Sequence, residues 1–232
     1  MTFNVCCEWG LEGISSLRPA SDVFVIIDVL SFSTCVDIAA ANGARIYPYR
    51  WRDERAAAYA LSIQAELVFK GIANPHGYAL SPSTLLNVPA GTSLVLPSPN
   101  GSTLSLETGD IPTFTGCLRN AAAVASLAQQ TGRRIGVIPA GERWGNGNLR
   151  FALEDLIGAG AVIACLRGSR SPEAELAVAA YLRFQDNLSD ALKSCLSGIE
   201  LIDRGRSKDL ELSAMLNVSQ CAPQLSQSCY SC

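Results

Sequence analysis

A single carboxylate, Asp28, closes an apolar run over residues 22–28, and three hydroxyl side chains follow it closely. A carboxylate at the carboxyl end of a buried strand can bind a hard cation or attack phosphorus. Ser31, Ser33 and Thr34 fall where a helix would begin, and amides and hydroxyls at a helix start can bind a phosphate. The alternative is that Ser33 or Thr34 only caps the helix.

A second polar turn follows the apolar residues 94–96 and contains Asn100, Gly101 and Ser102. The dipeptide Asn-Gly is first of all a turn signal. Because this turn stands between an expected strand and an expected helix, it could also form a second anion-binding turn. The sequence leaves both interpretations open, a plain turn and a phosphate contact.

Acidic residues gather in a third region. Glu142 and Arg143 follow an expected strand over residues 134–138, and Glu154 and Asp155 lie in an otherwise apolar helix. Neighbouring helix positions point about 100° apart, so one of these two acids can face inward. A buried acid is costly unless it is paired with a cation or a metal. The alternative places both acids on a hydrated face of the first helical turns, where they favour the helix dipole.

The donor atoms available in these three regions favour magnesium over zinc. His76 is the only histidine, and it lies in a stretch rich in glycine and proline. A Ser-His-Asp hydrolase or a histidine-ligated zinc site would depend on this one residue. The sequence has neither of the common glycine-rich nucleotide-binding motifs. Oxygen ligands remain, and they suit Mg²⁺.

The frame that would position these residues is an alternation of strands and helices. Strands are expected over residues 22–28, 45–49, 66–70, 93–96, 113–115 and 134–138. Helices are expected over residues 33–41, 53–64, 120–130 and 149–166, with one starting near Ser102, and residues 71–89 form a long loop. This order predicts an α/β fold with layers α/β/α and a mostly parallel sheet. In such a sheet, ligands bind beyond the carboxyl ends of the strands.

The C-terminal part is expected to be helical, over residues 173–187, 189–195 and 209–216. We expect one domain over residues 1–232, with a division into two lobes, about 1–110 and 111–232, left open. Hydrophobic residues make up 48% of the chain and charged residues 17%, which predicts a well-buried core and argues against disorder.

Charge and hydropathy narrow the classes of partner. The net charge is −3 and the basic residues are scattered, which argues against a nucleic-acid partner. No apolar run approaches the roughly 20 residues that span a bilayer, and the start does not resemble a signal peptide. We therefore expect a cytoplasmic protein with no membrane partner and a small anionic substrate. A homodimer is left open.

Nine cysteines form an odd count for a secreted disulfide framework. Most of them lie in apolar surroundings, which predicts small buried side chains. Only Cys229 and Cys232 have the C-x-x-C spacing, and they stand at the end of the chain. We expect a frayed tail there, with a redox or zinc site as the alternative.

Taken together and in order, these segments resemble the 2-phosphosulfolactate phosphatase family. Residues 27–34, Ile-Asp-Val-Leu-Ser-Phe-Ser-Thr, resemble the family's Ile-Asp-Val-Leu-Arg-Ala-Thr-Thr. Leu-Ser-Pro at 80–82 resembles Asn-Ser-Pro, and Pro-Asn-Gly-Ser at 99–102 resembles Thr-Asn-Gly-Thr. Leu-Arg-Asn-Ala at 118–121 resembles Leu-Asn-Ala, and Ala-Gly-Glu at 140–142, with the acid pair and Ala-Gly at 159–160, resembles the remaining pattern. The resemblance covers roughly residues 22–220.

This resemblance implies a Mg²⁺-dependent phosphatase that acts on a small sulfonated acid. It makes Asp28 a metal ligand or nucleophile, and Glu154 and Asp155 metal ligands or general acid and base. Phosphate would be bound by Ser33, Thr34, Asn100, Gly101 and Ser102. The other anionic groups would be bound by Arg119, Asn120 and Arg143, and Ser31 and Glu142 complete the expected site.

Two departures from the family pattern bear on the substrate. Ser31 stands where the signature has arginine, and Arg119 stands beside the Asn-Ala match and could replace that charge. Two other functions stay open. A haloacid-dehalogenase-type phosphatase also has an aspartate at a strand end, but its second aspartate would fall at Leu30. A binding protein that keeps the fold and a phosphate site is the other alternative.

Overall fold

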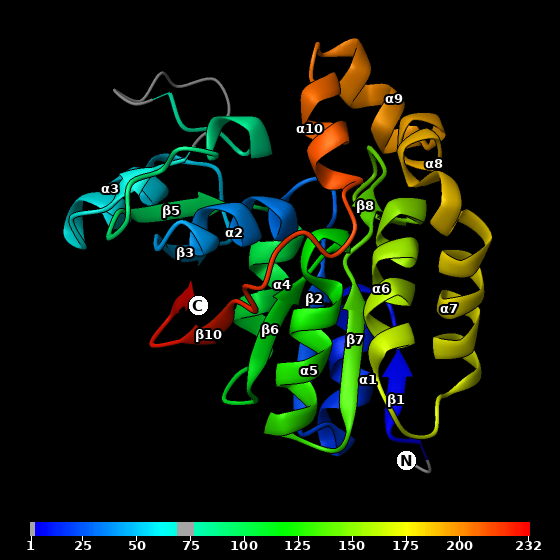
Figure 1. Cartoon of the computed structure of the whole chain (residues 1–232). Coiled ribbons are helices and arrows are strands. Elements are labelled where there is room, and N and C mark those ends of the chain that lie inside the picture. Colours follow the sequence, from blue (N-terminus) through cyan, green and yellow to red (C-terminus); the bar gives the residue numbers. More distant parts are fainter. Residues whose placement is uncertain (1–2, 69–76) are drawn as a thin grey trace.

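A computed structural model describes residues 3–68 and 77–232 of the chain. Its centre is a nine-stranded sheet in the order β1-β7-β2-β6-β10-β11-β3-β5-β4, drawn in Figure 1. The strands are β1 (Val5–Cys7), β2 (Val23–Ile27), β3 (Arg45–Tyr49), β4 (Glu66–Leu67), β5 (Ser93–Pro97), β6 (Thr113–Gly116), β7 (Ile135–Pro139), β10 (Gln224–Ser226) and β11 (Cys229–Ser231).

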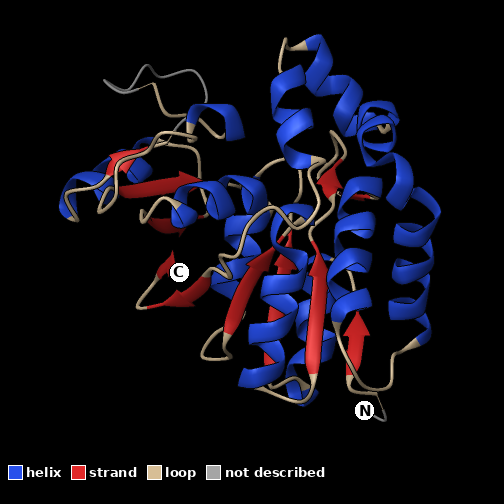
Figure 2. Ribbon diagram, viewed as in Figure 1, coloured by secondary structure: helices blue, strands red, loops and turns tan. Residues whose placement is uncertain are grey.

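The first group of strands, β1-β7-β2-β6, is wholly parallel. Ile27 lies opposite both Pro139 and Gly116, so β2, β7 and β6 end at the same edge of the sheet. Helix α7 (Pro172–Phe184) packs against β1 and α6 (Leu153–Cys165). On one face, β2 side chains pack against α5 (Ala121–Thr131) and α6. On the other face they pack against α1 (Gly10–Leu17) and α4 (Gly101–Glu107). The predicted α/β/α layering is confirmed (Figure 2).

The second group, β3-β5-β4, is also parallel. Ile46 of β3 belongs to a core that includes residues of α2 (Phe32–Ala41), whereas Tyr49 of the same strand stacks on Tyr59 of α3 (Glu54–Ser62), with ring centroids 5.2 Å apart. Alternate residues of a strand point to opposite faces, so the two helices cover opposite sides. Asp53 caps α3 as expected, because its side chain accepts a hydrogen bond from the Arg55 amide at 3.0 Å.

A C-terminal hairpin joins the two groups. β10 pairs antiparallel with β6, and β11 pairs antiparallel with β3. Tyr230 is fully buried, and its hydroxyl lies 2.8 Å from the Ser105 hydroxyl. Cys232 forms a disulfide with Cys221, not with Cys229. The expected frayed tail is therefore wrong: the apolar Tyr230 and the free edges of β3 and β6 draw this segment into the middle of the sheet.

The C-terminal part is helical up to Ser213, as expected. It contains α7, α8 (Leu188–Ser194), α9 (Leu196–Asp203) and α10 (Ser207–Ser213), of which α9 was not predicted. The long helix predicted over 149–166 begins only at Leu153. The reason is a small antiparallel hairpin, in which β8 (Glu142–Arg143) pairs with β9 (Leu149–Arg150). Within the described residues, no helix combines the length and the apolar character needed to cross a bilayer.

Candidate active site

A cavity of about 410 Å³ opens at the carboxyl edge of the sheet, where the parallel strands end. Its floor comes from the segments after β2 and β5, one wall comes from the β8–β9 hairpin, and the far side comes from α9 and the loop before α10. The lining residues are mostly polar: Asp28, Leu30, Ser31, Arg52, Leu80, Ser98, Pro99, Asn100, Glu142, Arg143, Arg150, Glu200, Leu201, Arg204 and Arg206.

Asp28 lies on the cavity floor, directly after β2, and the backbone fixes its carboxylate. The Gly101 amide donates to Oδ2 at 2.9 Å, and the Phe32 amide at the start of α2 donates to Oδ1 at 3.2 Å. The side chain of Ser33 accepts a hydrogen bond from the Asp28 amide at 2.9 Å. The amides of Gly101 and Phe32 therefore fix the orientation of the Asp28 carboxylate, and the lone pairs that they do not use are available to a ligand in the cavity.

The turn after β5 connects Asp28 with a second carboxylate. Asn100 donates from Nδ2 to Glu142 Oε2 at 2.9 Å, while the next residue, Gly101, donates to Asp28. A side chain at position 101 would have no room, because a Cβ atom there would lie 2.2 Å from the Phe32 ring. The Asn-Gly pair thus serves as more than a turn: it holds two acids at one edge of the cavity.

Burial makes both acids unusually weak, and a neighbouring carboxylate adds to the effect in each case. Burial raises the pKa of Asp28 to about 6, and the charge of Glu154 adds to this against the opposing amides of Gly101 and Phe32. Burial also raises the pKa of Glu142 to about 7, and the charge of Asp28 contributes further. A divalent cation between these carboxylates would remove that repulsion.

The acid pair of α6 lies behind the cavity and does not line it. Asp155 accepts from the Val29 amide at 2.7 Å and from the Gly141 amide at 2.9 Å, so it ties the end of β2 to the end of β7. Burial raises the pKa of Asp155 well above its usual range. Glu154 is also buried and lies beside the thiol of Cys195. Both acids face inward, and the geometry gives Asp155 a positioning role.

Arginine side chains form much of the opposite wall. Burial lowers the pKa of Arg52, while the nearby charges of Asp28 and Glu142 act in the other direction. Arg206 donates to the Leu80 carbonyl at 3.1 Å. These two arginines, with Arg143, Arg150 and Arg204, give the cavity an anion-binding character that the net charge of the chain does not reveal.

Three of the hydroxyl residues expected to bind phosphate are turned to the backbone. Thr34 donates to the Val29 carbonyl at 2.8 Å, and Ser102 donates to the Leu96 carbonyl at 2.6 Å. Ser33 contacts Thr115 and the Asp28 amide. All three are fully buried and bond to backbone groups at the strand ends. The expected helix cap at Ser33 or Thr34 is wrong, because the N-cap of α2 is Ser31, whose side chain makes no capping hydrogen bond. Ser31, by contrast, lines the cavity.

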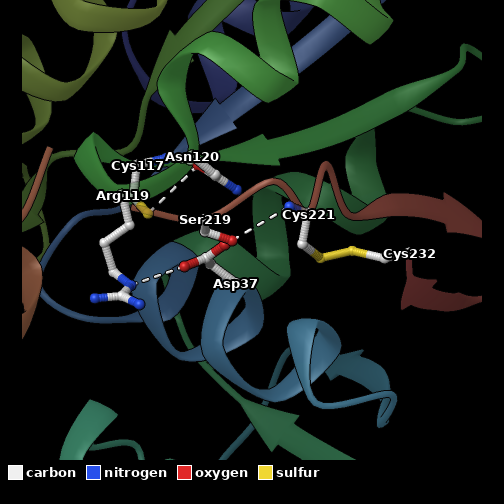
Figure 3. Close-up of a disulfide and its surroundings, with 7 residues drawn as sticks. All are labelled: Asp37, Cys117, Arg119, Asn120, Ser219, Cys221 and Cys232. Atoms are coloured by element: carbon white, nitrogen blue, oxygen red, sulfur yellow. Dashed lines mark hydrogen bonds and ion pairs between the residues drawn. A yellow bond between two sulfur atoms is a disulfide. The ribbon is translucent and has the colours of Figure 1, made fainter. Parts of the chain in front are cut away.

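Arg119 and Asn120 do not line the cavity either. Figure 3 shows Arg119 directed at Asp37 and Asn120 directed at Cys117. Arg119 Nε lies 2.8 Å from Oδ2 of the fully buried Asp37, and its Nη1 donates to the Leu212 carbonyl at 3.2 Å. Asn120 accepts from the Cys117 amide at 2.9 Å and so closes the turn that precedes α5. Arg119 is therefore committed to neutralising a buried acid and cannot take the place of the arginine missing at Ser31.

Comparison with known proteins identifies the family. The family model described as 2-phosphosulpholactate phosphatase matches residues 12–228. The chain belongs to this family. It is 29% identical over 219 residues to a 2-phosphosulfolactate phosphatase of Methanothermobacter thermautotrophicus, covering 90% of each chain. It is 30% identical over 220 residues to a probable 2-phosphosulfolactate phosphatase of Carboxydothermus hydrogenoformans, covering 90% of this chain and 88% of the relative.

Because the family resemblance implies a Mg²⁺ cofactor, the cavity residues must offer ligands that suit this ion. Within the described residues, no group of three or more histidine, cysteine, aspartate or glutamate side chains is arranged to hold a metal ion. Mg²⁺, however, is commonly held by one or two carboxylates together with water and substrate phosphate. Asp28 and Glu142 provide this donor set, and the charge of Asp28, which helps to raise the pKa of Glu142, is one that a cation between them would offset. Asp155 and Glu154 do not reach the cavity.

Four cavity arginines escaped the sequence analysis: Arg52, Arg150, Arg204 and Arg206. They lie on three separate segments, with Arg204 and Arg206 on the same one, and only the fold brings these segments together. A usable signal existed for Arg150, because Asn146 and Gly147 form a hairpin-turn signal between Glu142 and Arg150. His76, the only histidine, lies outside the described residues.

Proposed function

We propose that this chain is a phosphoric monoester hydrolase that acts on 2-phosphosulfolactate or a related phosphorylated hydroxy acid, with Mg²⁺ as its cofactor. The observation that carries the proposal is the pairing of two cavity-facing carboxylates, Asp28 and Glu142, with a wall of arginines. Membership of the family and the printed names of the two relatives support the same activity.

The substrate named by the relatives matches this cavity chemically. 2-Phosphosulfolactate is a lactate that carries a phosphate ester and a sulfonate, so it presents three anionic groups. A largely enclosed site must meet such charges with cations and hydrogen-bond donors. Arg52 lies near both acids, Arg150 lies near Glu142, and Arg143, Arg204 and Arg206 line the same cavity. The cavity can therefore hold phosphate at the acidic end and the other groups farther along.

Asp28 and Glu142 would hold Mg²⁺ at the phosphate end. Mg²⁺ there would supply positive charge that polarises the phosphoryl oxygens and favours loss of a proton from the attacking water. In the hydrolysis, a water oxygen forms a bond to phosphorus, the phosphorus–ester oxygen bond breaks, and the hydroxy acid leaves with a proton. The amides of Gly101 and Phe32 keep the Asp28 carboxylate from rotating, and Asp155 keeps the ends of β2 and β7 together.

A phosphate-release assay tests the proposal directly. The purified chain is supplied with 2-phosphosulfolactate, with Mg²⁺ or with excess EDTA, and Arg133→Met serves as a control in an exposed arginine far from the cavity. Release that needs Mg²⁺ and is unchanged in Arg133→Met would support the proposal. Absence of release from 2-phosphosulfolactate and from an aryl phosphate would contradict it and favour a non-enzymatic binding protein.

Three further expectations concern an alternative phosphatase class, the location of the protein and its oligomeric state. The family assignment argues against the haloacid-dehalogenase alternative, and Leu30 lines the cavity where that class needs a second aspartate. A cytoplasmic location and a homodimer stay predictions from the sequence.

A further inference from the structure

We infer that Arg150 selects the substrate by binding its second anionic group, the sulfonate or carboxylate that is not hydrolysed, and that Glu200 holds this place when no substrate is bound. The inference rests on the proposed function, because it assigns the substrate's non-phosphate end to one part of the same cavity. It is carried by the hydrogen-bonding state of Arg150, by the ion pairs of Glu200 and by the register of the β8–β9 hairpin.

Arg150 is a buried cation with an unused donor. The residue is 5% exposed and lines the cavity, yet its Nη1 atom is buried and has no hydrogen-bond partner. Its Nη2 atom makes two long contacts, with the Ser197 hydroxyl at 3.4 Å and with the Glu200 carboxylate at 3.5 Å. Leaving a buried charged donor unpaired is costly, and native structures rarely do so without a reason. An anionic ligand group in the cavity would supply the missing acceptor.

Glu200 partly compensates the charge of Arg150 without binding it closely. Its carboxylate lies 3.5 Å from Arg150 Nη2 and 3.9 Å from Arg204 Nη2, both longer than a normal charge-assisted hydrogen bond. The Glu200 side chain is 42% exposed, so it can turn to solvent. It therefore behaves as an internal counter-ion shared by two arginines, which a better-placed anion can displace.

The hairpin register places this anion site beside the metal end. Arg150 lies directly opposite Glu142 in the β8–β9 pairing. Directly paired residues of an antiparallel ribbon present their side chains on the same face, with Cβ atoms about 5 Å apart. Glu142, where Mg²⁺ would hold the phosphate, and Arg150, which would bind the second anionic group, are thus directly paired residues. This spacing suits charged groups on adjacent carbon atoms of a small acid.

The ring of Trp144 helps to hold the guanidinium in this place. The Arg150 guanidinium carbon lies 5.7 Å from the centroid of the Trp144 ring, within the range of a cation–π contact. Trp144 belongs to the turn of the same hairpin. The arginine is therefore positioned by its own hairpin before any substrate arrives, which favours recognition by a planar, two-pronged donor.

The test compares two esters and one ligand that does not react. Arg150→Met, Glu200→Gln and the control Arg133→Met are assayed on 2-phosphosulfolactate and on an aryl phosphate, whose remainder is uncharged. Binding of sulfolactate, which has no phosphate to lose, is measured by calorimetry for each variant. Far-UV circular dichroism and thermal unfolding confirm that each variant is folded.

For Arg150→Met, we expect kcat/KM on 2-phosphosulfolactate to fall by about 10- to 100-fold, with a change of at most about threefold on the aryl phosphate. Sulfolactate binding should weaken by a similar factor. Glu200→Gln should tighten sulfolactate binding by about two- to fivefold, because it removes a weak competing ion pair. Arg133→Met should change none of these quantities.

Two results would overturn the inference while leaving the phosphatase proposal intact. The first is an equal loss on both esters with sulfolactate binding unchanged, which would assign Arg150 to the phosphate. The second is weaker or unchanged sulfolactate binding in Glu200→Gln, which decides the matter even if Arg150→Met does not fold. Conversely, sulfolactate binding that depends on Arg150 in a protein that hydrolyses neither ester would support the inference and defeat the proposed function.

Discussion

β2 and β6 are parallel neighbours that end at the same edge of the sheet, yet their ends have different roles. Each strand is followed by polar residues and then by a helix, and both ends were expected to contact the substrate. After β2, Asp28 opens into the cavity. After β6, Arg119 is bound to the buried Asp37, and Asn120 is bound to its own turn.

The difference lies in what covers each strand end. The segment that leads to the C-terminal hairpin runs over the end of β6, where the Asn217 amide donates to the Leu118 carbonyl and the Ser219 amide donates to the Arg119 carbonyl, at 3.0 and 2.9 Å. The end of β2 meets instead the β8–β9 hairpin and the arginines of the cavity wall. A strand end therefore concentrates polar residues, and the covering segment decides whether they meet a ligand or one another.

The open end should show the largest effect. Asp28→Asn should lower kcat by at least about 1,000-fold with Mg²⁺ present, because it removes a carboxylate at the proposed metal site. The asparagine oxygen can accept from only one of the two amides, Gly101 or Phe32, which now donate to separate oxygens, so the variant should lose about 1–3 kcal/mol of stability and still fold. Steady-state kinetics and circular dichroism measure the two quantities. Near-normal kcat would make Asp28 a structural acid and remove the basis of the comparison.

The covered end should respond in stability and not in catalysis. Arg119→Met should lower the free energy of unfolding by about 3 kcal/mol, since it leaves the fully buried Asp37 without its cation. Its kcat/KM should stay within about twofold of the wild type under conditions where the protein is folded. Urea unfolding and kinetics check this pair of outcomes.

A second substitution separates the ion pair from simple loss of packing. Arg119→Met combined with Asp37→Asn should recover part of the lost stability, because the uncompensated charge is gone. A selective loss of activity on 2-phosphosulfolactate in folded Arg119→Met would instead return this residue to the substrate site.

Glu142, on the cavity wall beside the end of β2, provides a test of the proposed Mg²⁺ site. Glu142→Gln should weaken Mg²⁺ binding by about tenfold, measured by calorimetry without substrate, because one of the two proposed carboxylate ligands is lost. Burial raises the pKa of Glu142 to about 7, so part of the wild-type protein carries a proton there at neutral pH. Metal binding must release that proton, and Mg²⁺ affinity should therefore rise between pH 6 and pH 8. Glu142→Gln should flatten this rise, and an unchanged pH profile would argue against Glu142 as a ligand.

The smallest effect is expected from a substitution at the amino end of β2. Asp22 precedes the strand and binds Arg134, whose hydrogen bond lowers the pKa of Asp22 to about 2. Because the folded-state pKa lies below the ordinary value, this stabilisation is present above about pH 4 and is lost as the pH falls towards 2. Asp22→Asn should lower Tm by about 1–3 °C at pH 7, with no change in activity. A difference in Tm that did not shrink in acid would mean that the pair is not its cause.

Local patterns allowed much of the frame to be predicted. The run that ends at Asp28 is β2, the Asn-Gly turn does begin a helix at Gly101, and the layered arrangement was correct. These features depend on residues close together in the chain. Whether a hydroxyl is free for a ligand was not predicted, because that depends on how the chain turns back at each strand end. Ser33, Thr34 and Ser102 have suitable side chains, but carbonyl groups of the preceding strand or loop accept their hydrogen bonds.

The cationic wall could not be predicted for a related reason. Arg52, Arg150 and Arg206 lie on segments distant in the sequence, and each looks like an ordinary surface arginine until the fold brings them together. The C-terminal hairpin was missed because it is short and follows a polar stretch. Its place depends on two open strand edges, which are themselves formed by other parts of the chain.

The central position of that hairpin has a consequence for synthesis on the ribosome. β3 and β6 are made long before β10 and β11, and until the hairpin arrives each of them leaves one edge unpaired. Unpaired edges of this kind are templates for aggregation, and contacts between distant segments form slowly. The nascent chain thus passes through a stage in which two half-sheets wait for the strands that will join them, and helper proteins that shield such edges would have their greatest effect at that stage.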